Sequence, residues 1–437
     1  MSFIIVFVFI LLLFLVRSFR VLDSLSKGLI TVYIVEWWYS IYVSRLQLWG
    51  MRPIDEGVTW LLILHVVTFL LGFMFIANRN KSIVSSQTTV NTIEANIKHF
   101  LSNKWFIVVL LISTVYVLGK FAIFYQQVVL LNAIGDLRDS YYSGDMYGNE
   151  FELVQAFLLS PMDIICAVLW AYSLFRHRNW VFLVMTVFLF ANNSLVGGRV
   201  GYLIIGFMLP LIMILLGIRI RKYLPALTGL LIVVYLIISF ITAARFGGSG
   251  ELSFDNIVNN GVEETNKQIV TYSVGPVAAF NVSLDQDFAR QLGGYKNGAI
   301  VGASFVHLTY IIMNKLGKPF RQPFLDYSER IQDEYINIGS GQWNALYTSV
   351  NVYYLDSGII GVILYPFLFG FLFCLIIKLL LKTQSIWHFF LLGFMCRMVF
   401  FSICNYGFTS GFTLIMVLAF YFLGKRKKKS SISFINK

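Results

Sequence analysis

Apolar runs of about 16 to 24 residues recur along most of the chain, and polar connections separate them. A helix rises 1.5 Å per residue, so it needs about 20 residues to cross a hydrocarbon core about 30 Å thick. The pattern predicts an all-α integral membrane protein, a polytopic bundle of about eleven transmembrane helices. We place them at residues 2–16, 27–43, 57–76, 105–124, 154–175, 179–194, 199–217, 224–243, 357–380, 386–403 and 407–423.

Composition supports lipid as the main solvent of the chain. Hydrophobic residues make up 58% of the 437 residues and charged residues 13%, and the mean hydropathy is +0.74. These values lie outside the range of soluble domains. The net charge of +12 does not indicate nucleic-acid binding, because most Lys and Arg lie in short clusters between apolar runs. The four cysteines lie in or beside apolar runs without metal-ligand spacing, so we expect no metal and no other cofactor.

The charges between the spans predict an orientation. Every second connection is basic, beginning with Arg17, Arg20 and Lys27 after the first span and ending with the tail at 425–437. Cytoplasmic connections of membrane proteins carry an excess of Lys and Arg. We therefore expect an external N-terminus and a cytoplasmic C-terminus.

One connection, from about residue 245 to 355, is much longer than the others. It is rich in Gly, Asn, Asp and Tyr, and its stretches 280–292 and 302–316 carry apolar residues at helical spacing. Loops of this length are usually functional. We predict an external, periplasmic and partly helical cap, which separates spans 1–8 in residues 1–244 from spans 9–11 in residues 356–424.

Charged residues inside the spans are candidates for function, because charge is unfavourable at membrane depth. Glu36, Lys120 and Asp163 lie within predicted spans, and Arg397 lies near the middle of the tenth. Two interpretations of Arg397 stay open. It contacts a substrate, or it forms a structural ion pair with a carboxylate such as Glu36 or Asp163.

Two arginines lie beside glycine pairs at the predicted external face. Arg199 directly follows the pair at 197–198, and Arg245 precedes the pair at 247–248. A positive charge at a helix N-terminus is unfavourable unless an anion is present, and phosphate suits both the helix end and the guanidinium fork. We predict that the two arginines bind a pyrophosphate. For Arg199, the alternative is an interfacial side chain that reaches lipid headgroups.

Three sequence blocks together resemble the oligosaccharide repeat-unit polymerases, the O-antigen polymerase (Wzy-type) family. The first is SLVGGR at 194–199. The second is YSVGPVAAFN at 272–281, followed by GASF at 302–305. The third is NALYT at 344–348, followed by YLDSGIIG at 354–361. The order of the blocks around one long loop extends the resemblance over roughly residues 194–370.

The resemblance implies an enzyme of the bacterial inner membrane, a glycosyltransferase of O-antigen (lipopolysaccharide) or capsule synthesis. Members of this family move a growing glycan from undecaprenyl pyrophosphate to the terminal sugar of a fresh lipid-linked repeat unit. The implied partners are these lipid-linked oligosaccharides, the membrane lipid and a chain-length regulator protein.

The resemblance also suggests roles for individual residues. Arg199 and Arg245 would bind the diphosphate, with Arg290 and Arg397 as helpers. An acceptor hydroxyl needs at most one general base, for which the candidates are Asp356, Glu329 and His307. Sugar contacts would come from Tyr272, Asn281 and Asn344.

Structural interpretations of these residues stay open beside the functional ones. Asp356 is alternatively a helix cap for the ninth span, and His307 alternatively a satisfied packing residue on an apolar helix. Asn and Tyr in a turn-rich cap are also often structural.

Two other functions remain alternatives. An O-antigen ligase would transfer finished glycan from the same lipid carrier and would share the long loop and the arginines. A transporter of lipid-linked oligosaccharide or polysaccharide would predict charge through the full depth of the bundle and helices broken in paired positions.

Overall fold

The described residues of the computed structural model are almost all helical. They are residues 2–19, 22–79, 86–131, 149–195, 200–218, 223, 225, 228, 229, 232, 235, 236, 239, 262–318, 324, 327, 336–339, 341–343, 347–404, 406, 407 and 411–425. The predicted span at 224–243 and the basic tail fall mostly outside them.

The first part of the chain forms a series of mostly apolar helices. They are α1 (Ser2–Ser18), α2 (Ser24–Ser44), α3 (Glu56–Arg79), α4 (Gln87–Leu101), α5 (Lys104–Leu131), α7 (Asn149–Val154), α8 (Ser160–Arg176), α9 (Trp180–Ser194) and α10 (Val200–Leu215). A π-helical turn, Gln155–Leu159, joins α7 to α8. A 3-10 turn, Leu48–Gly50, follows α2.

The predicted cap contributes α13 (Val262–Asp285), α14 (Phe288–Gln291), α15 (Ala303–Lys315) and an antiparallel pair of short strands, β1 (Ile336–Asn337) and β2 (Gln342–Trp343). The helical spacing predicted at 280–292 and 302–316 is confirmed by these helices. The chain continues with α17 (Ser349–Thr383), α18 (Ile386–Phe400) and α19 (Gly411–Lys425).

Several helices are long and apolar enough to cross a membrane. The long ones cover Glu56–Arg79, Lys104–Ile123, Gln155–Arg176 and Ser349–Thr383. Shorter apolar helices cover Ile4–Ser18, Trp180–Ser194, Ile386–Phe400 and Gly411–Lys425. The predicted multi-pass helical character of the chain is therefore confirmed.

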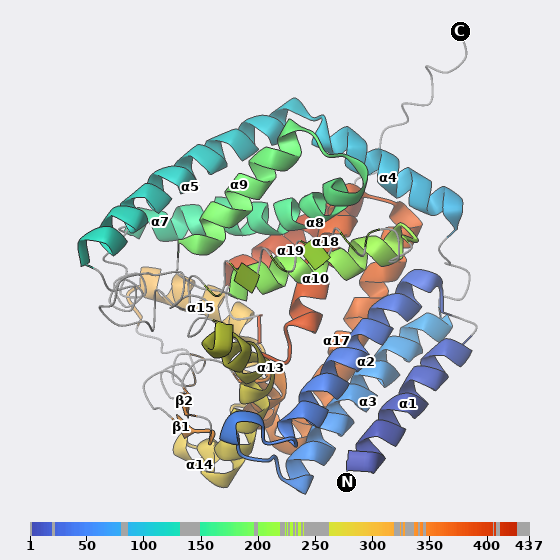
Figure 1. The fold of residues 1–437 in the computed structure, drawn as a ribbon, viewed down its shortest axis with the longest axis vertical. Coiled ribbons are helices and arrows are strands. Elements are labelled where there is room, and N and C mark those ends of the chain that lie inside the picture. The colour runs from blue at the N-terminus through green and yellow to red at the C-terminus, as the bar shows by residue number, and fades with distance from the viewer. Residues whose placement is uncertain are drawn as a thin grey trace.

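The helices pack in two groups. Figure 1 shows α1, α2, α3 and α17 together, and α5, α8, α9, α10, α18 and α19 in a second group. The helices α13 and α14 lie with the strands in the lower left part of the view, and α15 lies at the left, where it packs on α19.

The helices α3 and α17 cross at close range. A Cβ built on Gly72 of α3 would lie 2.7 Å from the carbonyl carbon of Phe367, and one built on Gly370 of α17 would lie 2.9 Å from the carbonyl carbon of Phe69. Two glycines therefore allow the two backbones to touch. Small residues at crossings favour helix association in membranes, where lipid is as apolar as the side chains.

An ion pair joins α17 to the start of α2. Lys378 Nζ lies 3.3 Å from Asp23 Oδ2, and the two side chains are 2% and 0% exposed. Asp23 is also the N-cap of α2, because its Oδ1 accepts a hydrogen bond from the Ser26 N–H at 3.0 Å. One carboxylate thus satisfies a helix end and a buried lysine.

The start of α17 differs from the prediction. The ninth span was expected to begin at 357, but α17 begins at Ser349, with Thr348 as its N-cap. The predicted start is instead a kink, where Ser357 has φ −148° and Gly358 has φ 61°. The polar turns before the kink are helical because protein surrounds them: residues 349–353 are all buried.

Candidate functional site

The predicted site residues fall into three classes. Arg199, Arg245 and Asn344 lie outside the described residues, as does the alternative base Glu329. Tyr272 lies in α13, but its side chain is not among those that the structure describes. The other five, which the structure distributes over separate places, are Asp356, His307, Arg290, Arg397 and Asn281.

Asp356 lies at the kink of α17, beneath a glycine-rich turn of the predicted cap. Its Oδ1 accepts a hydrogen bond from the Ile300 N–H at 3.0 Å, and its backbone carbonyl accepts one from the Asn297 N–H at 2.7 Å. The side chain is 0% exposed, and the Tyr365 hydroxyl, which also bonds the Ser357 hydroxyl at 2.8 Å, interacts with the Asp356 carboxylate. Asp356 does not cap the start of α17, which Thr348 does. It holds the turn instead.

The turn at 293–300 needs unusual backbone angles to reach Asp356. Gly293, Gly294 and Gly298 have φ of 75°, 91° and 97°, and Asn297 has φ 49°. Glycine adopts this left-handed region without strain, and Asn is among the few other residues that tolerate it. The Tyr295 ring packs on Gly358, where a Cβ would lie 3.1 Å from the ring. The glycines and Asn297 thus allow the turn to adopt the backbone angles with which it packs on the kink.

Further contacts join α13 to the first turns of α17. The Ser283 hydroxyl donates to Asn351 Oδ1 at 2.6 Å, and the rings of Phe280 and Tyr354 are 6.2 Å apart. Phe280 belongs to the second resemblance block and Tyr354 to the third. The described parts of these two blocks therefore meet around Asp356.

Asn281 binds neighbouring protein groups on both sides of its amide. Its Oδ1 accepts from the Asp55 N–H at 2.7 Å, and its Nδ2 donates to Asp55 Oδ2 at 3.3 Å and to Asp285 Oδ2 at 3.2 Å. The side chain is 6% exposed. These bonds fasten α13 to the segment before α3, which is the structural interpretation of Asn281.

His307 lies on α15 against the start of α19. Its Nδ1 accepts a hydrogen bond from the Gly411 N–H at 3.1 Å, and its ring meets that of Phe412 edge-on with centroids 6.0 Å apart. Partial burial lowers the pKa of His307, because the charged imidazolium loses hydration. The lone pair of Nδ1 is already in use, so the packing interpretation fits this geometry.

Arg290 lies on the short helix α14 with an exposed side chain. Its backbone N–H donates to Asp287 Oδ1 at 3.3 Å. Within the described chain, no ion pair or hydrogen bond joins Asp356 to Arg290, His307 or Arg397.

Arg397 lies in the last turn of α18 rather than near the middle of a span, because α18 ends at Phe400. A cation is favourable there, at the negative end of the helix. Its Nη1 lies 3.2 Å from Asp163 Oδ2 of α8. Of the two predicted carboxylate partners, Asp163 is the one that the structure shows.

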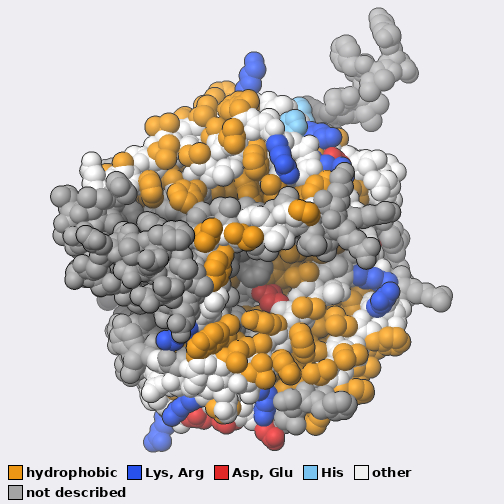
Figure 2. Space-filling model, viewed as in Figure 1, with side chains coloured by type: hydrophobic (Ala, Val, Ile, Leu, Met, Phe, Trp, Pro, Cys, Tyr) orange, Lys and Arg blue, Asp and Glu red, His pale blue; other side chains and the backbone are white. Residues whose placement is uncertain are grey.

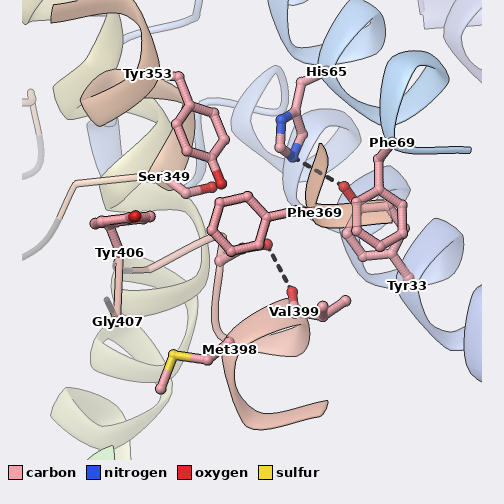
Figure 3. Close-up of a pocket in the computed structure, with 11 residues that line it drawn as sticks. Tyr33, His65, Phe69, Ser349, Tyr353, Phe369, Met398, Val399, Tyr406 and Gly407 are labelled. Atoms are coloured by element: carbon pink, nitrogen blue, oxygen red, sulfur yellow. Dashed lines mark hydrogen bonds between the residues drawn. The ribbon is translucent and has the colours of Figure 1, made fainter. Parts of the chain in front are cut away.

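A small cavity separates α2, α3 and α17 from the end of α18 (Figure 3). Its volume is ≈ 20 Å³, enough for one water-sized group. The Tyr33 hydroxyl lies 2.9 Å from His65 Nε2. In the part of the chain that the structure describes, His65 Nδ1 has no hydrogen-bond partner, and the Ser349 side chain interacts with the Tyr353 hydroxyl.

The cavity adjoins the kink of α17 through Tyr406. This residue lines the cavity, and its hydroxyl donates to the carbonyl of Val301, the neighbour of Ile300. The prediction from sequence omitted His65, although an ionisable residue within a span at 57–76 was a signal for it.

The visible face of the molecule is hollowed near its centre (Figure 2). Acidic side-chain atoms lie in the hollow, and hydrophobic side chains surround it. Among the described residues, no three His, Cys, Asp or Glu side chains form a group that could hold a metal ion.

Comparison of the chain with protein-family models, curated proteins and solved structures finds no match in any of the three. The physical features of the chain and the resemblance of its three blocks are therefore the basis for a function.

Proposed function

We propose that this protein polymerises lipid-linked oligosaccharide repeat units in a bacterial inner membrane. It would transfer the growing glycan from undecaprenyl pyrophosphate to the terminal sugar of an incoming lipid-linked unit, as an O-antigen or capsule polymerase. The proposal includes about eleven spans, an external N-terminus and a cytoplasmic C-terminus.

One observation carries most of the support. Residues of the second and third resemblance blocks, far apart in the sequence, converge on the kink of α17. The rings of Phe280 and Tyr354 join the two blocks, and Asp356 of the third block bonds the turn at 297–300, which lies between the two parts of the second block. A helix kink that encloses a fully buried carboxylate is an uncommon arrangement, since acidic side chains are rarely fully buried. Such a kink is more typical of a functional site than of a purely structural helix.

In the proposed reaction, the acceptor hydroxyl oxygen attacks the anomeric carbon of the donor glycan. A new glycosidic bond forms, and the bond from that carbon to the diphosphate oxygen breaks. Undecaprenyl diphosphate leaves with the bonding electron pair, and the hydroxyl proton passes to a base or to the leaving diphosphate. Guanidinium groups suit the negative charge that develops on the leaving group.

The reaction needs groups that bind the diphosphate and a group that accepts the hydroxyl proton. Arg199 and Arg245 would bind the diphosphate, and Arg397 and Arg290 would assist. Asp356 is the preferred base, because its bond to the Ile300 N–H uses Oδ1 and not Oδ2. Its complete burial requires the turn at 293–300 to move when an acceptor sugar binds.

Deletion of the gene in its host tests the function. Polysaccharide is then resolved by gel electrophoresis. Loss of the polymer with retention of single repeat units on the final acceptor is expected for a polymerase. Polymer stranded on the lipid carrier would instead indicate a ligase, and repeat units trapped on the cytoplasmic side would indicate a transporter. A full polymer ladder in the deletion strain contradicts all three functions.

Point variants in the complemented strain test the residues. Arg199→Lys and Arg245→Lys are expected to lose polymer while the protein stays in the membrane, because lysine keeps the charge but lacks the planar fork. Asp356→Asn is expected to lose polymer while its oxygen still accepts from Ile300. Arg17→Lys is the matched control, since Arg17 is exposed and lies at the end of α1. Normal chain length in both arginine variants would contradict the proposed diphosphate site.

A further inference from the structure

The ion pair between Arg397 and Asp163 links α18 to α8 across the second helix group. Arg397 Nη1 and Asp163 Oδ2 are 3.2 Å apart, and the two side chains are 30% and 10% exposed. The two residues are distant in the sequence: Asp163 lies just after the π-helical turn that joins α7 to α8, and Arg397 lies in the last turn of α18. The Arg397 side chain is therefore partly exposed, whereas the Asp163 side chain is nearly buried.

The carboxylate of this pair is held from its other side by two asparagines of α9. Asn192 Nδ2 and Asn193 Nδ2 donate to Asp163 Oδ1 at 3.3 Å and 3.1 Å. Asn193 Nδ2 also donates to the Leu189 carbonyl at 2.8 Å, so both of its amide hydrogens are used. Asp163 thus accepts three hydrogen bonds, which fix its orientation and spread its charge.

Arg397 is much less satisfied than Asp163. A guanidinium group has five N–H donors, and the described structure gives Arg397 a single acceptor, Asp163 Oδ2. Arginine–carboxylate pairs are frequently bidentate, because the planar fork matches the carboxylate, whereas this pair uses one nitrogen and one oxygen. Most donors of Arg397 are thus left for another acceptor, at the end of a helix that is apolar along its length.

The neighbouring sequence indicates where that acceptor would lie. Asn192 and Asn193 directly precede the SLVGGR block at 194–199, whose arginine we assign to the diphosphate. Arg397 and Asp163 therefore lie beside the end of α9 from which this block continues. Phosphate oxygens are the acceptors that match several guanidinium N–H groups at once.

We propose that Asp163, held by Asn192 and Asn193, is a positioning residue that orients Arg397 to bind a phosphate oxygen of the polyprenyl diphosphate. This inference rests on the substrate class of the proposed function. It adds three residues, Asp163, Asn192 and Asn193, that do not touch the substrate themselves. They act by keeping the free edge of the guanidinium group pointed at it.

The direction in which Asp163→Asn changes the affinity for an anion distinguishes positioning from simple charge neutralisation. Asp163→Asn removes a negative charge near the bound anion. If Asp163 only neutralised Arg397, anion binding would become tighter, because a repulsive charge is lost. If Asp163 positions Arg397, binding becomes weaker, because the guanidinium group loses its charge-assisted anchor.

Direct binding measures this difference without relying on turnover. The purified full-length protein is placed in nanodiscs of phosphatidylcholine, and the Kd for undecaprenyl diphosphate is measured by native mass spectrometry. Asp163→Asn and Arg397→Lys are each expected to raise this Kd about tenfold, and Arg17→Lys is expected to leave it unchanged. Phosphatidylglycerol, a phosphate lipid without a diphosphate, is measured in parallel and is expected to bind weakly and equally to all forms.

A milder variant guards against loss of the fold. Asn192→Ala leaves the ion pair in place and removes one of its supports, so a smaller rise in Kd, about threefold, is expected. Size-exclusion elution and the thermal midpoint identify any variant that is not folded.

Two results would overturn the inference. The first is a Kd for undecaprenyl diphosphate in Asp163→Asn that equals or falls below the wild-type value. The second is equal weakening of phosphatidylglycerol and undecaprenyl diphosphate in Arg397→Lys, which would assign the site to general lipid headgroups. Binding through these residues in a protein whose deletion leaves the polymer ladder intact would retain the inference and refute the polymerase. Polymer loss on deletion, with wild-type binding in the variants, would refute the inference alone.

Discussion

The crossing of α3 and α17 gives a prediction whose size follows from the structure. Gly72→Ala would place a Cβ 2.7 Å from the carbonyl carbon of Phe367. Non-bonded carbon atoms prefer about 3.5–4.0 Å, so the two backbones must separate by about 1 Å. Overpacking of this kind lowers stability by about 1–3 kcal/mol, and the helix propensity of alanine offsets up to about 1 kcal/mol of it.

Gly119→Ala is the matched control for this prediction. Gly119 lies on the exposed face of α5 and has no atom within 4 Å of a built Cβ. The same substitution there is expected to leave the protein equally stable or slightly more stable, by up to about 1 kcal/mol. Both variants and the wild type are purified in one detergent, and their free energies of unfolding are compared by denaturant titration, with thermal midpoints as a second measure.

The close crossing also predicts a local effect on hydrogen exchange. His65 lies on α3 and Phe369 on α17, and both line the cavity of Figure 3. Separation of the two helices should increase hydrogen exchange around this cavity in Gly72→Ala and not in Gly119→Ala. Equal stability of the two variants would show that the helices do not touch at Gly72, and would refute the close crossing.

Three further predictions concern other contacts. Lys378→Met should lower the free energy of unfolding by about 3–5 kcal/mol, because the Asp23 carboxylate stays buried without its cation. Addition of Asp23→Asn, which still caps α2, should recover much of that loss in the same titration; no recovery would argue against the pair. Gly358→Ala should destabilise the protein by about 1–3 kcal/mol, since φ is 61° there and the new methyl group meets Tyr295. Tyr295→Ala in the same protein should relieve only the steric part, and full recovery would refute the backbone strain. The lowered pKa of His307 means that folding favours the neutral ring, so stability should fall as pH drops below the ordinary value of 6.5. Hydrogen exchange in α15 should rise at pH 5.5 in the wild type and not in His307→Gln, and an identical pH response in both would contradict this assignment.

The region around Asp356 shows why contact between distant segments matters for the proposed function. Neither the YLDSGIIG stretch nor the glycines before it indicate by themselves that one binds the other. The Ile300 N–H and the Asp356 carboxylate are 56 positions apart in the sequence. Their bond forms because the turn at 293–300 can adopt positive φ and close over the kink.

The start of the ninth span predicted from sequence differs from the start of the helix for a local reason. The start of the ninth span was placed at 357, where the apolar run begins. The helix starts earlier because the more polar turn from Ser349 is buried against protein, where Ser283 donates to Asn351. Apolar runs report where lipid surrounds a helix and not where the helix itself begins.

The sequence alone determined that this is a multi-pass helical membrane protein. An apolar run of about 20 residues has one common way to satisfy its backbone hydrogen bonds in lipid, which is an α-helix. It also determined that part of the long segment before α17 is helical, through the apolar spacing of α13 and α15. Both results depend on residues that are neighbours along the chain.

Only the tertiary structure decided which polar groups meet. Either Glu36 or Asp163 was compatible with Arg397, and the packing of α18 on α8 selected Asp163, 234 positions away. The same holds for the glycines that let α3 touch α17. Such pairings depend on the angles and distances at which helices pack, and these arise from the whole set of contacts rather than from any one stretch of sequence.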